Sequence, residues 1–204
     1  MKIWVGITDG DWFEYLSRRQ PDEVNFWQPS GGRQFRVLQP GEPFLFKLHS
    51  PRNSIVGGGF FVRHTALPCS LAWSAFGHKN GVESLEEFLV RISKYRRSET
   101  IERDPTIGCS ILAEPFFFPE SDWIPVPADW AANIVQGKTY DSTQESGAEL
   151  WAAVQARLAL LTRQVEIGER ESRYGAEYLR RPIGTGRLPR TGHGGLRQTL
   201  RHHR

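Results

Sequence analysis

Short blocks of apolar residues run through the first two thirds of the chain. At residues 2–7, Ile3, Val5 and Ile7 alternate with other residues, as they do in a half-buried strand. Similar blocks rich in Val, Ile and aromatic residues predict strands at 24–27, 44–48, 55–62, 107–112 and 116–118. The pattern therefore predicts several short sequential strands.

Two helices are predicted from capping-box patterns that precede apolar residues at helical spacing. The first begins at Asp11, three residues before Glu14, and the second begins after Ser84, three residues before Glu87. A stripe of Leu and Val from about 147 to 168 predicts a third and longest helix. Strands interleaved with helices favour an α+β fold.

The segment LQPGEPFLFKLHSPRNSIVGGGFFV, residues 38–62, is the one around which the other elements are arranged. Its two predicted strands flank a polar loop that is broken by Pro51. The second strand contains residues 57–59, three consecutive glycines. Such glycines are tolerated where a strand bends sharply, or where another backbone or a flat ligand comes close. We therefore expect a curled sheet with a polar loop at one end and bare backbone surface at the other.

Composition and charge indicate a globular chain without an overall basic surface. Apolar residues make up 39% of the 204 residues, with 7 Trp and 12 Phe, which is enough to form a core. The formal charge is +3, but five arginines lie in residues 182–204, and setting them aside leaves −2 for residues 1–181. Any surface that binds nucleic acid must therefore be local.

Several function classes receive no support from the sequence. There is no long apolar run and no charged-then-apolar leader, so no membrane contact or secretion is expected. Cys69 and Cys109 are far apart, which favours reduced core residues in a cytoplasmic protein. The histidines have no metal-ligand spacing, and no phosphate-loop or nucleophile-elbow motif is present. We therefore expect no catalytic residues, no metal site and no cofactor.

Four blocks of the sequence resemble a known family. They are KIWVGITDGDWFEYLS, FFVRH, IGCSILAEPFFFPESDWIPVP and NIVQGKTYD. In this order they are similar to the N-terminal recognition region of bacterial HNH endonucleases, restriction-type enzymes that place a PUA-like reader before a nuclease module. Residues 38–62 also resemble the EVE domains of the PUA-like superfamily, which are close relatives of YTH domains. The resemblance covers about residues 1–180.

This resemblance implies a PUA-like (EVE/YTH-related) small curled β-barrel with flanking helices. The recognition domain would span residues 1–145, followed by a long helix or linker at 146–181 that leads toward a nuclease module. Residues 182–204 are rich in Gly and Arg and lack apolar periodicity, which predicts a basic disordered tail. A divalent metal would belong to the HNH module, which we expect to be missing.

The tail itself suggests why that module is missing. HNH modules of this family open with a segment like GAFRVLVTDAYxRRCAITG. Codons permitted for residues 186–204 spell a close variant of this segment when they are read one base out of frame. Our hypothesis is that the tail is the HNH start read after a frameshift. A downstream reading frame without an HNH-type motif would contradict it.

The resemblance further implies a pocket that holds one extruded base between aromatic faces. Asn25 and Ser50 would read a base edge, and Trp4 and Trp27 would sandwich its faces. The competing interpretation places Trp4 and Phe26 in the core and makes His49 an ordinary loop histidine. The complete predicted pocket is Trp4, Asn25, Phe26, Trp27, His49 and Ser50, and the predicted phosphate contacts are Arg33, Arg36, Lys47, Arg52, Arg63 and Lys138.

The expected function is DNA binding without catalysis. The domain would read a modified base, with modified cytosine favoured, in double-stranded DNA by base flipping. One alternative is a PUA/YTH-like module that binds modified RNA, because those relatives use the same type of pocket. Another is an inert, truncated remnant.

Overall fold

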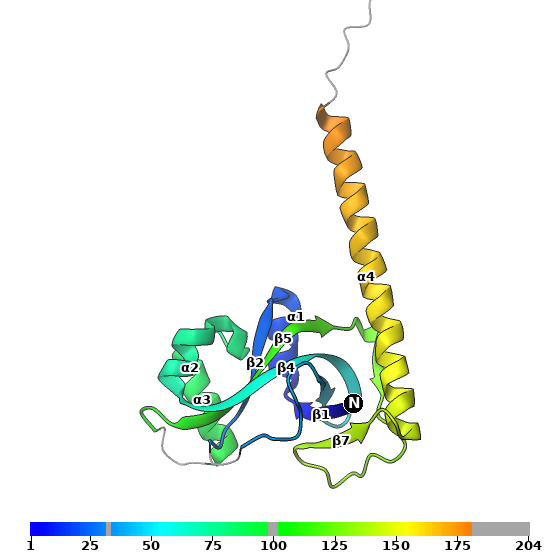
Figure 1. The fold of residues 1–204 in the computed structure, drawn as a ribbon. Helices are drawn as coiled ribbons and strands as arrows, with labels where there is room; N and C mark the ends of the chain where they lie inside the picture. The colour runs from blue at the N-terminus through cyan, green and yellow to red at the C-terminus, as the bar shows by residue number, and fades with distance from the viewer. Residues whose placement is uncertain (32–33, 98–101, 181–204) are drawn as a thin grey trace, which may run out of the picture. The chain divides into compact units, whose positions relative to one another are not determined.

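The computed structural model describes residues 1–31, 34–97 and 102–180, with side-chain environments up to Gln164 (Figure 1). Residues Met1–Thr162 form one compact unit, and the second unit begins at Arg163. The elements in chain order are β1 (Lys2–Thr8), α1 (Gly10–Arg19), β2 (Glu23–Gln28), β3 (Pro43–Leu48), β4 (Ser54–Pro68), α2 (Cys69–Phe76), η1 (Gly77–Asn80), α3 (Leu85–Arg96), β5 (Thr106–Phe117), η2 (Glu120–Asp122), β6 (Ile124–Pro125), β7 (Gly137–Asp141) and α4 (Glu145–Arg180).

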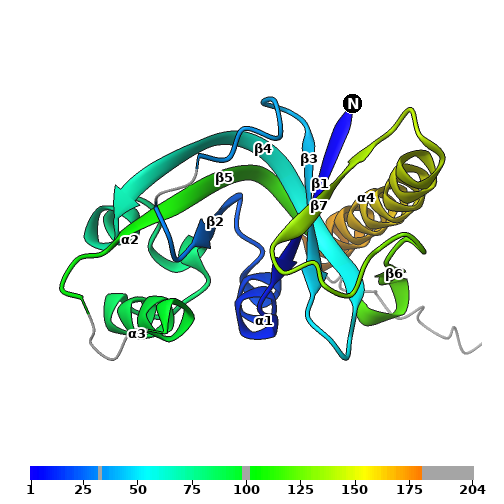
Figure 2. The same ribbon diagram turned by 90° about the horizontal axis from the view of Figure 1, so that it is seen from below.

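The strands form one mixed sheet that curls around α1. Its order is β2-β5-β4-β3-β1-β7, with β6 added to β4. The β1–β3 pair is parallel, whereas the other pairs are antiparallel. Figure 2 shows β4 and β5 bending together into an arch, with α1 on the inner side of the curve. Within the described residues, β2 and β7 end the path without pairing with each other, so the sheet curls without closing.

The glycines of β4 make close packing of neighbouring backbone possible. A Cβ on Gly57 would lie 2.3 Å from the Phe116 carbonyl oxygen, and one on Gly58 would lie 2.7 Å from the Phe44 carbonyl oxygen. The β4–β5 register also shifts between Gly58 and Phe60, and such irregularities bend strands. Of the expected reasons for these glycines, bending and backbone approach therefore apply. The expected bare surface is wrong, because residues 57–59 are buried.

Two apolar clusters cover opposite sides of the β1–β3 region. On the inner side, Trp12 and Leu16 of α1 pack with Phe44 and Phe46 of β3. The outer cluster contains alternate residues of β1 and β3 together with Tyr140, Leu150 and Val154 of β7 and α4; its β1 and β3 members are Ile3, Val5 and Leu45. The strand pattern of β1 and β3 thus supplies one side chain to each cluster in turn.

A third apolar cluster lies under α2 and α3. Phe88 and Ile92 of α3 pack there with Ile107 of β5 and with Cys69 and Cys109. Both cysteines are free and buried, and burial raises the pKa of the Cys69 thiol to about 12. They behave as apolar core residues, as expected. In the described part of the chain, no helix has both the length and the apolar character needed to cross a membrane.

The helix starts follow the capping patterns, with one change. Ser84 caps α3, as predicted, because its hydroxyl accepts from the Glu87 N–H at 3.2 Å. The N-cap of α1 is Asp9 instead of Asp11: the Asp9 carboxylate accepts from the Asp11 N–H at 3.1 Å. This two-residue difference matters, because it fixes the Asp9 side chain where β1 ends.

Candidate functional site

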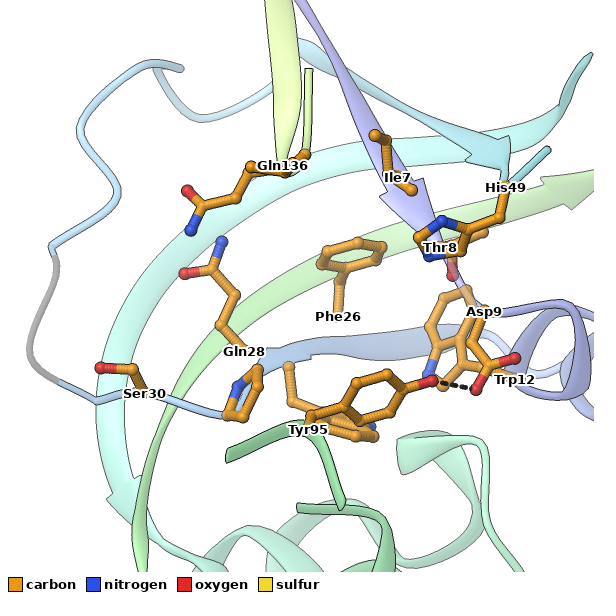
Figure 3. A pocket seen from close by; sticks show the side chains of 13 residues that line it. Ile7, Thr8, Asp9, Trp12, Phe26, Gln28, Ser30, His49, Tyr95 and Gln136 are labelled. Atoms are coloured by element: carbon orange, nitrogen blue, oxygen red, sulfur yellow. Dashed lines mark hydrogen bonds between the residues drawn. The ribbon is translucent and has the colours of Figure 1, made fainter. Parts of the chain in front are cut away.

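A pocket of about 500 Å³ opens where β1, β2 and α3 meet the loop after β3 (Figure 3). Its volume falls within the roughly 300–1,000 Å³ that is typical of ligand-binding sites. Residues at the end of β1 and His49 from the loop after β3 both line it. The residues that line it are Ile7, Thr8, Asp9, Trp12, Phe26, Trp27, Gln28, Pro29, Ser30, His49, Tyr95, Val135 and Gln136.

Aromatic side chains form much of the wall. Phe26 stands in the middle of the view in Figure 3, between Trp12 and the two glutamines, and Tyr95 lies at the near edge. A hydrogen bond fixes the orientation of the Trp27 ring: its Nε1–H donates to the Asn80 carbonyl oxygen at 2.9 Å. Rings that approach from several sides suit a flat, unsaturated ligand, since such a ligand can stack on them.

A polar corner lies at one side of this wall. The Tyr95 hydroxyl donates to Asp9, and Asp9 also accepts from the Asp11 N–H. Burial, followed by this hydrogen bond to Asp9, raises the pKa of the Tyr95 phenol. Tyr95 therefore keeps its proton. Gln28 and Gln136 lie on the opposite side of the pocket in Figure 3, so hydrogen-bonding groups flank the aromatic centre.

Two buried asparagines, Asn25 and Asn80, hydrogen-bond to each other next to the pocket. Asn25 Nδ2 donates to Asn80 Oδ1 at 2.9 Å, and Asn80 in turn donates to the carbonyl oxygens of Ala72 and Gly77. Both asparagines have no exposed surface. Asn25 is thus a structural residue that fixes β2 against η1, and it has no surface to offer a base. The prediction that Asn25 reads a base edge is corrected accordingly.

The other five predicted pocket residues divide into two groups. Phe26, Trp27 and His49 line the pocket together. Trp4 does not line it, because its ring packs edge-on against Phe35 with centroids 5.4 Å apart. Ser50 is exposed in the loop after β3 and also does not line the pocket. The predicted sandwich of a base between Trp4 and Trp27 therefore does not fit this geometry.

Three of the predicted phosphate contacts have other partners. Lys47 is only 4% exposed, and its Nζ donates to Asn53 Oδ1 at 2.7 Å. Burial lowers the pKa of Lys47. Arg52 and Lys138 form ion pairs with carboxylates, at 3.0 Å to Glu14 and 2.7 Å to Asp129. Lys47 is therefore ruled out as a phosphate contact, and the other two are partly neutralised.

The remaining predicted cations differ in position. Arg63 is exposed on β4, and Arg36 is exposed and donates to Gln34. Neither has an ion pair within the described part of the chain. Arg33 lies outside the described residues, as does the tail at 182–204. The phosphate role of these residues stays a prediction.

Several lining residues were not predicted from the sequence. Asp9 stands in the strand-to-helix junction TDGDW, where a polar side chain at the end of a strand is a usable signal. Tyr95 lies between Lys94 and Arg96 in the basic last turn of α3, where no motif indicates a pocket residue. Gln136 precedes β7 within the block NIVQGKTYD, from which only Lys138 was predicted to contact the ligand. Among the described side chains, no three of His, Cys, Asp or Glu gather where they could hold a metal ion.

Comparison with known proteins bears on the fold. No protein-family model matches the chain, and no curated protein matches it. A mutant of the ASCH protein from Zymomonas mobilis is similar in structure, with a TM-score of 0.50 over 76% of this chain and 99% of that chain, at 9% identity. The non-mutant ASCH structure gives 0.48, over 74% of this chain and 94% of that one, at 10% identity.

The fold is PUA-like. The mixed sheet with flanking helices and the similarity to an ASCH structure confirm the prediction of an α+β, PUA-like fold. The predicted barrel differs from the structure, because β2 and β7 do not pair within the described residues. At 9% identity the similarity concerns the fold alone. The curled sheet positions the pocket, because it brings residues at the ends of β1 and β2 together with Tyr95 of α3.

Proposed function

We propose that this chain is a nucleic-acid-binding module that holds one unpaired base, and that its ligand is single-stranded RNA. The observation that carries the proposal is the pocket itself. It combines Trp12, Phe26, Trp27 and Tyr95 with hydrogen-bonding groups on two sides, in a volume suited to a base. Stacking on aromatic side chains contributes about 1–3 kcal/mol per base. The PUA-like fold supports the same conclusion.

Electrostatics favours a single strand over a duplex. Extruding a base from a duplex costs a few kcal/mol, which phosphate contacts must offset. Residues 1–181 carry a formal charge of −2, and many described cations are paired with carboxylates, such as Arg19 with Glu83 and Lys79 with Asp22. An unpaired base in a single strand needs no extrusion. The proposal assigns binding to this chain, and catalysis is no part of it.

The second candidate is recognition of a modified cytosine in double-stranded DNA, as part of an HNH-type restriction system. It is supported by the four sequence blocks that resemble those recognition regions. The same pocket would then receive a flipped base. The nucleotide sequence that follows the codon for Arg204 tests this candidate independently, because the candidate predicts an HNH-type motif there in another frame.

Competition binding separates the two candidates. A fluorescent single-stranded RNA nonamer would be displaced by unlabelled RNA with and without N6-methyladenosine, by double-stranded RNA, and by DNA duplexes carrying 5-methylcytosine, 5-hydroxymethylcytosine or cytosine. We expect single-stranded RNA to compete at least about tenfold better than any duplex. Preference for a modified DNA duplex would favour the second candidate. Equal, weak competition by all of them would contradict both and favour an inert remnant.

A further inference from the structure

We infer that Asp9 determines which base the pocket accepts: one that presents an amino group, such as cytosine, adenine or guanine, in preference to uracil. This inference rests on the proposed function and adds the specificity of the same pocket. It concerns a residue that the sequence resemblance does not assign.

The Asp9 corner offers only acceptors. A carboxylate has two oxygens with about four lone-pair sites, and no donor. Asp9 uses one site for the Asp11 N–H and one for the Tyr95 hydroxyl, so further sites remain. Because the Tyr95 hydroxyl hydrogen is directed to Asp9, the tyrosine oxygen can only accept from a ligand. The raised pKa of Tyr95 keeps that hydrogen in place.

Rigidity makes this corner selective. Asp9 is the N-cap of α1, and its two carboxylate oxygens are held by groups from α1 and from α3. The carboxylate therefore cannot rotate away from an unsuitable ligand without losing both hydrogen bonds. By contrast, Gln28 and Gln136 can present either an oxygen or an NH₂ group, so they accept most base edges. Asp9 is therefore the residue that distinguishes one base from another.

The consequence differs between bases. Cytosine and adenine carry an amino group on the edge that normally pairs, and guanine carries one beside a ring N–H. Each can donate to a carboxylate. Uracil has no amino group, and the one donor on this edge is its ring N–H, which lies between two carbonyl oxygens. If this N–H donates to Asp9, a carbonyl oxygen comes close to the carboxylate, and this contact between two acceptors weakens binding in a partly desolvated site. The negative charge also disfavours entry of a phosphate group, so the nucleotide must enter base first.

Single-stranded RNA nonamers provide the test. The probes are a nonamer of uridine alone and three others with one central cytidine, adenosine or guanosine. We expect the wild-type chain to bind at least one of the three about tenfold more tightly than the uridine nonamer. Asp9→Asn should reduce this preference to less than about threefold, because an amide can turn its NH₂ group toward a carbonyl. Asparagine remains an effective N-cap, so α1 should stay intact.

Asp11→Asn is the matched control. It changes the charge by the same amount on the same helix turn, but Asp11 is exposed and does not line the pocket. It should leave the preference unchanged. Asp9→Ser, which also caps helices, should abolish the preference as well, and a thermal melt of each variant checks folding.

The outcomes separate the two proposals. Equal affinity for all four nonamers, with binding still weakened by Tyr95→Ala, would overturn the role of Asp9 and leave the proposed function standing. A preference that survives Asp9→Asn in a folded protein would do the same. No binding to any nonamer would overturn the proposed function, and the inference with it.

Discussion

Replacing Tyr95 by alanine is expected to weaken binding of single-stranded RNA by about 5- to 140-fold. This range corresponds to the roughly 1–3 kcal/mol that one aromatic stacking partner contributes. Tyr95 lines the pocket, approaches Trp27 with ring centroids 5.9 Å apart, and holds Asp9 through its hydroxyl. The substitution removes both an aromatic ring that lines the pocket and the hydroxyl that donates to Asp9. Fluorescence anisotropy with a labelled nonamer measures the change.

The control for this variant is Val90→Ala on the same helix. Val90 is 52% exposed and does not line the pocket, so its truncation should leave affinity unchanged. Tyr95 is itself 41% exposed, and its removal should therefore lower the melting temperature only slightly. Equal affinity of the Tyr95→Ala and Val90→Ala variants would show that the pocket is not where RNA binds.

Replacing Gly57 by alanine is expected to lower the free energy of unfolding by more than about 3 kcal/mol. The new Cβ would lie 2.3 Å from the Phe116 carbonyl oxygen, and backbone in the centre of a sheet cannot move aside cheaply. For a chain of this size, a loss of that amount lowers the melting temperature by about 6–12 °C. Circular dichroism during heating and during urea unfolding measures both quantities.

Gly10→Ala is the matched control for Gly57→Ala. At Gly10, in the first turn of α1, the nearest heavy atom to a new Cβ is an arginine nitrogen 3.9 Å away. The same chemical change should therefore leave the stability within about 1 kcal/mol of wild type. If Gly57→Ala were equally harmless, the close approach of β4 to β5 would be wrong, and with it the curvature that shapes the pocket.

Local patterns were sufficient to predict several of the elements, including β1, α1 and α3, but they divided β5 (Thr106–Phe117) into two strands. Alternating apolar residues marked β1, and capping residues marked the two shorter helices, because these signals act over a few residues. The glycines of residues 57–59 correctly indicated a bend or a close backbone contact. The α+β, PUA-like fold followed from these elements together with the resemblance of the sequence blocks.

The pocket was harder to predict, because its parts are distant in sequence. Asp9 meets Tyr95 across 86 positions, and Asn25 meets Asn80 across 55. In a chain with 12% aromatic residues, composition does not distinguish a ring in the core from a ring in a wall.

Lys47 illustrates the same limit. A lysine in a strand suggests a surface, but β3 lies between β4 and β1 and carries buried clusters on both faces. Only the pairing of the strands shows that Lys47 must end among buried atoms. The positions of basic residues in the sequence alone therefore predicted a phosphate contact, Lys47, that the folded chain buries.

The central claim is that a base enters the pocket whose wall includes Trp12 and Trp27. The chain has 7 tryptophans, and each indole N–H gives a separate signal in a two-dimensional NMR spectrum of ¹⁵N-labelled protein. On titration with the central-cytidine nonamer, we predict that the Trp12 and Trp27 signals shift, whereas those of Trp73 and Trp151, which do not line the pocket, stay in place. Binding of this RNA with the Trp12 and Trp27 signals unmoved would contradict the account.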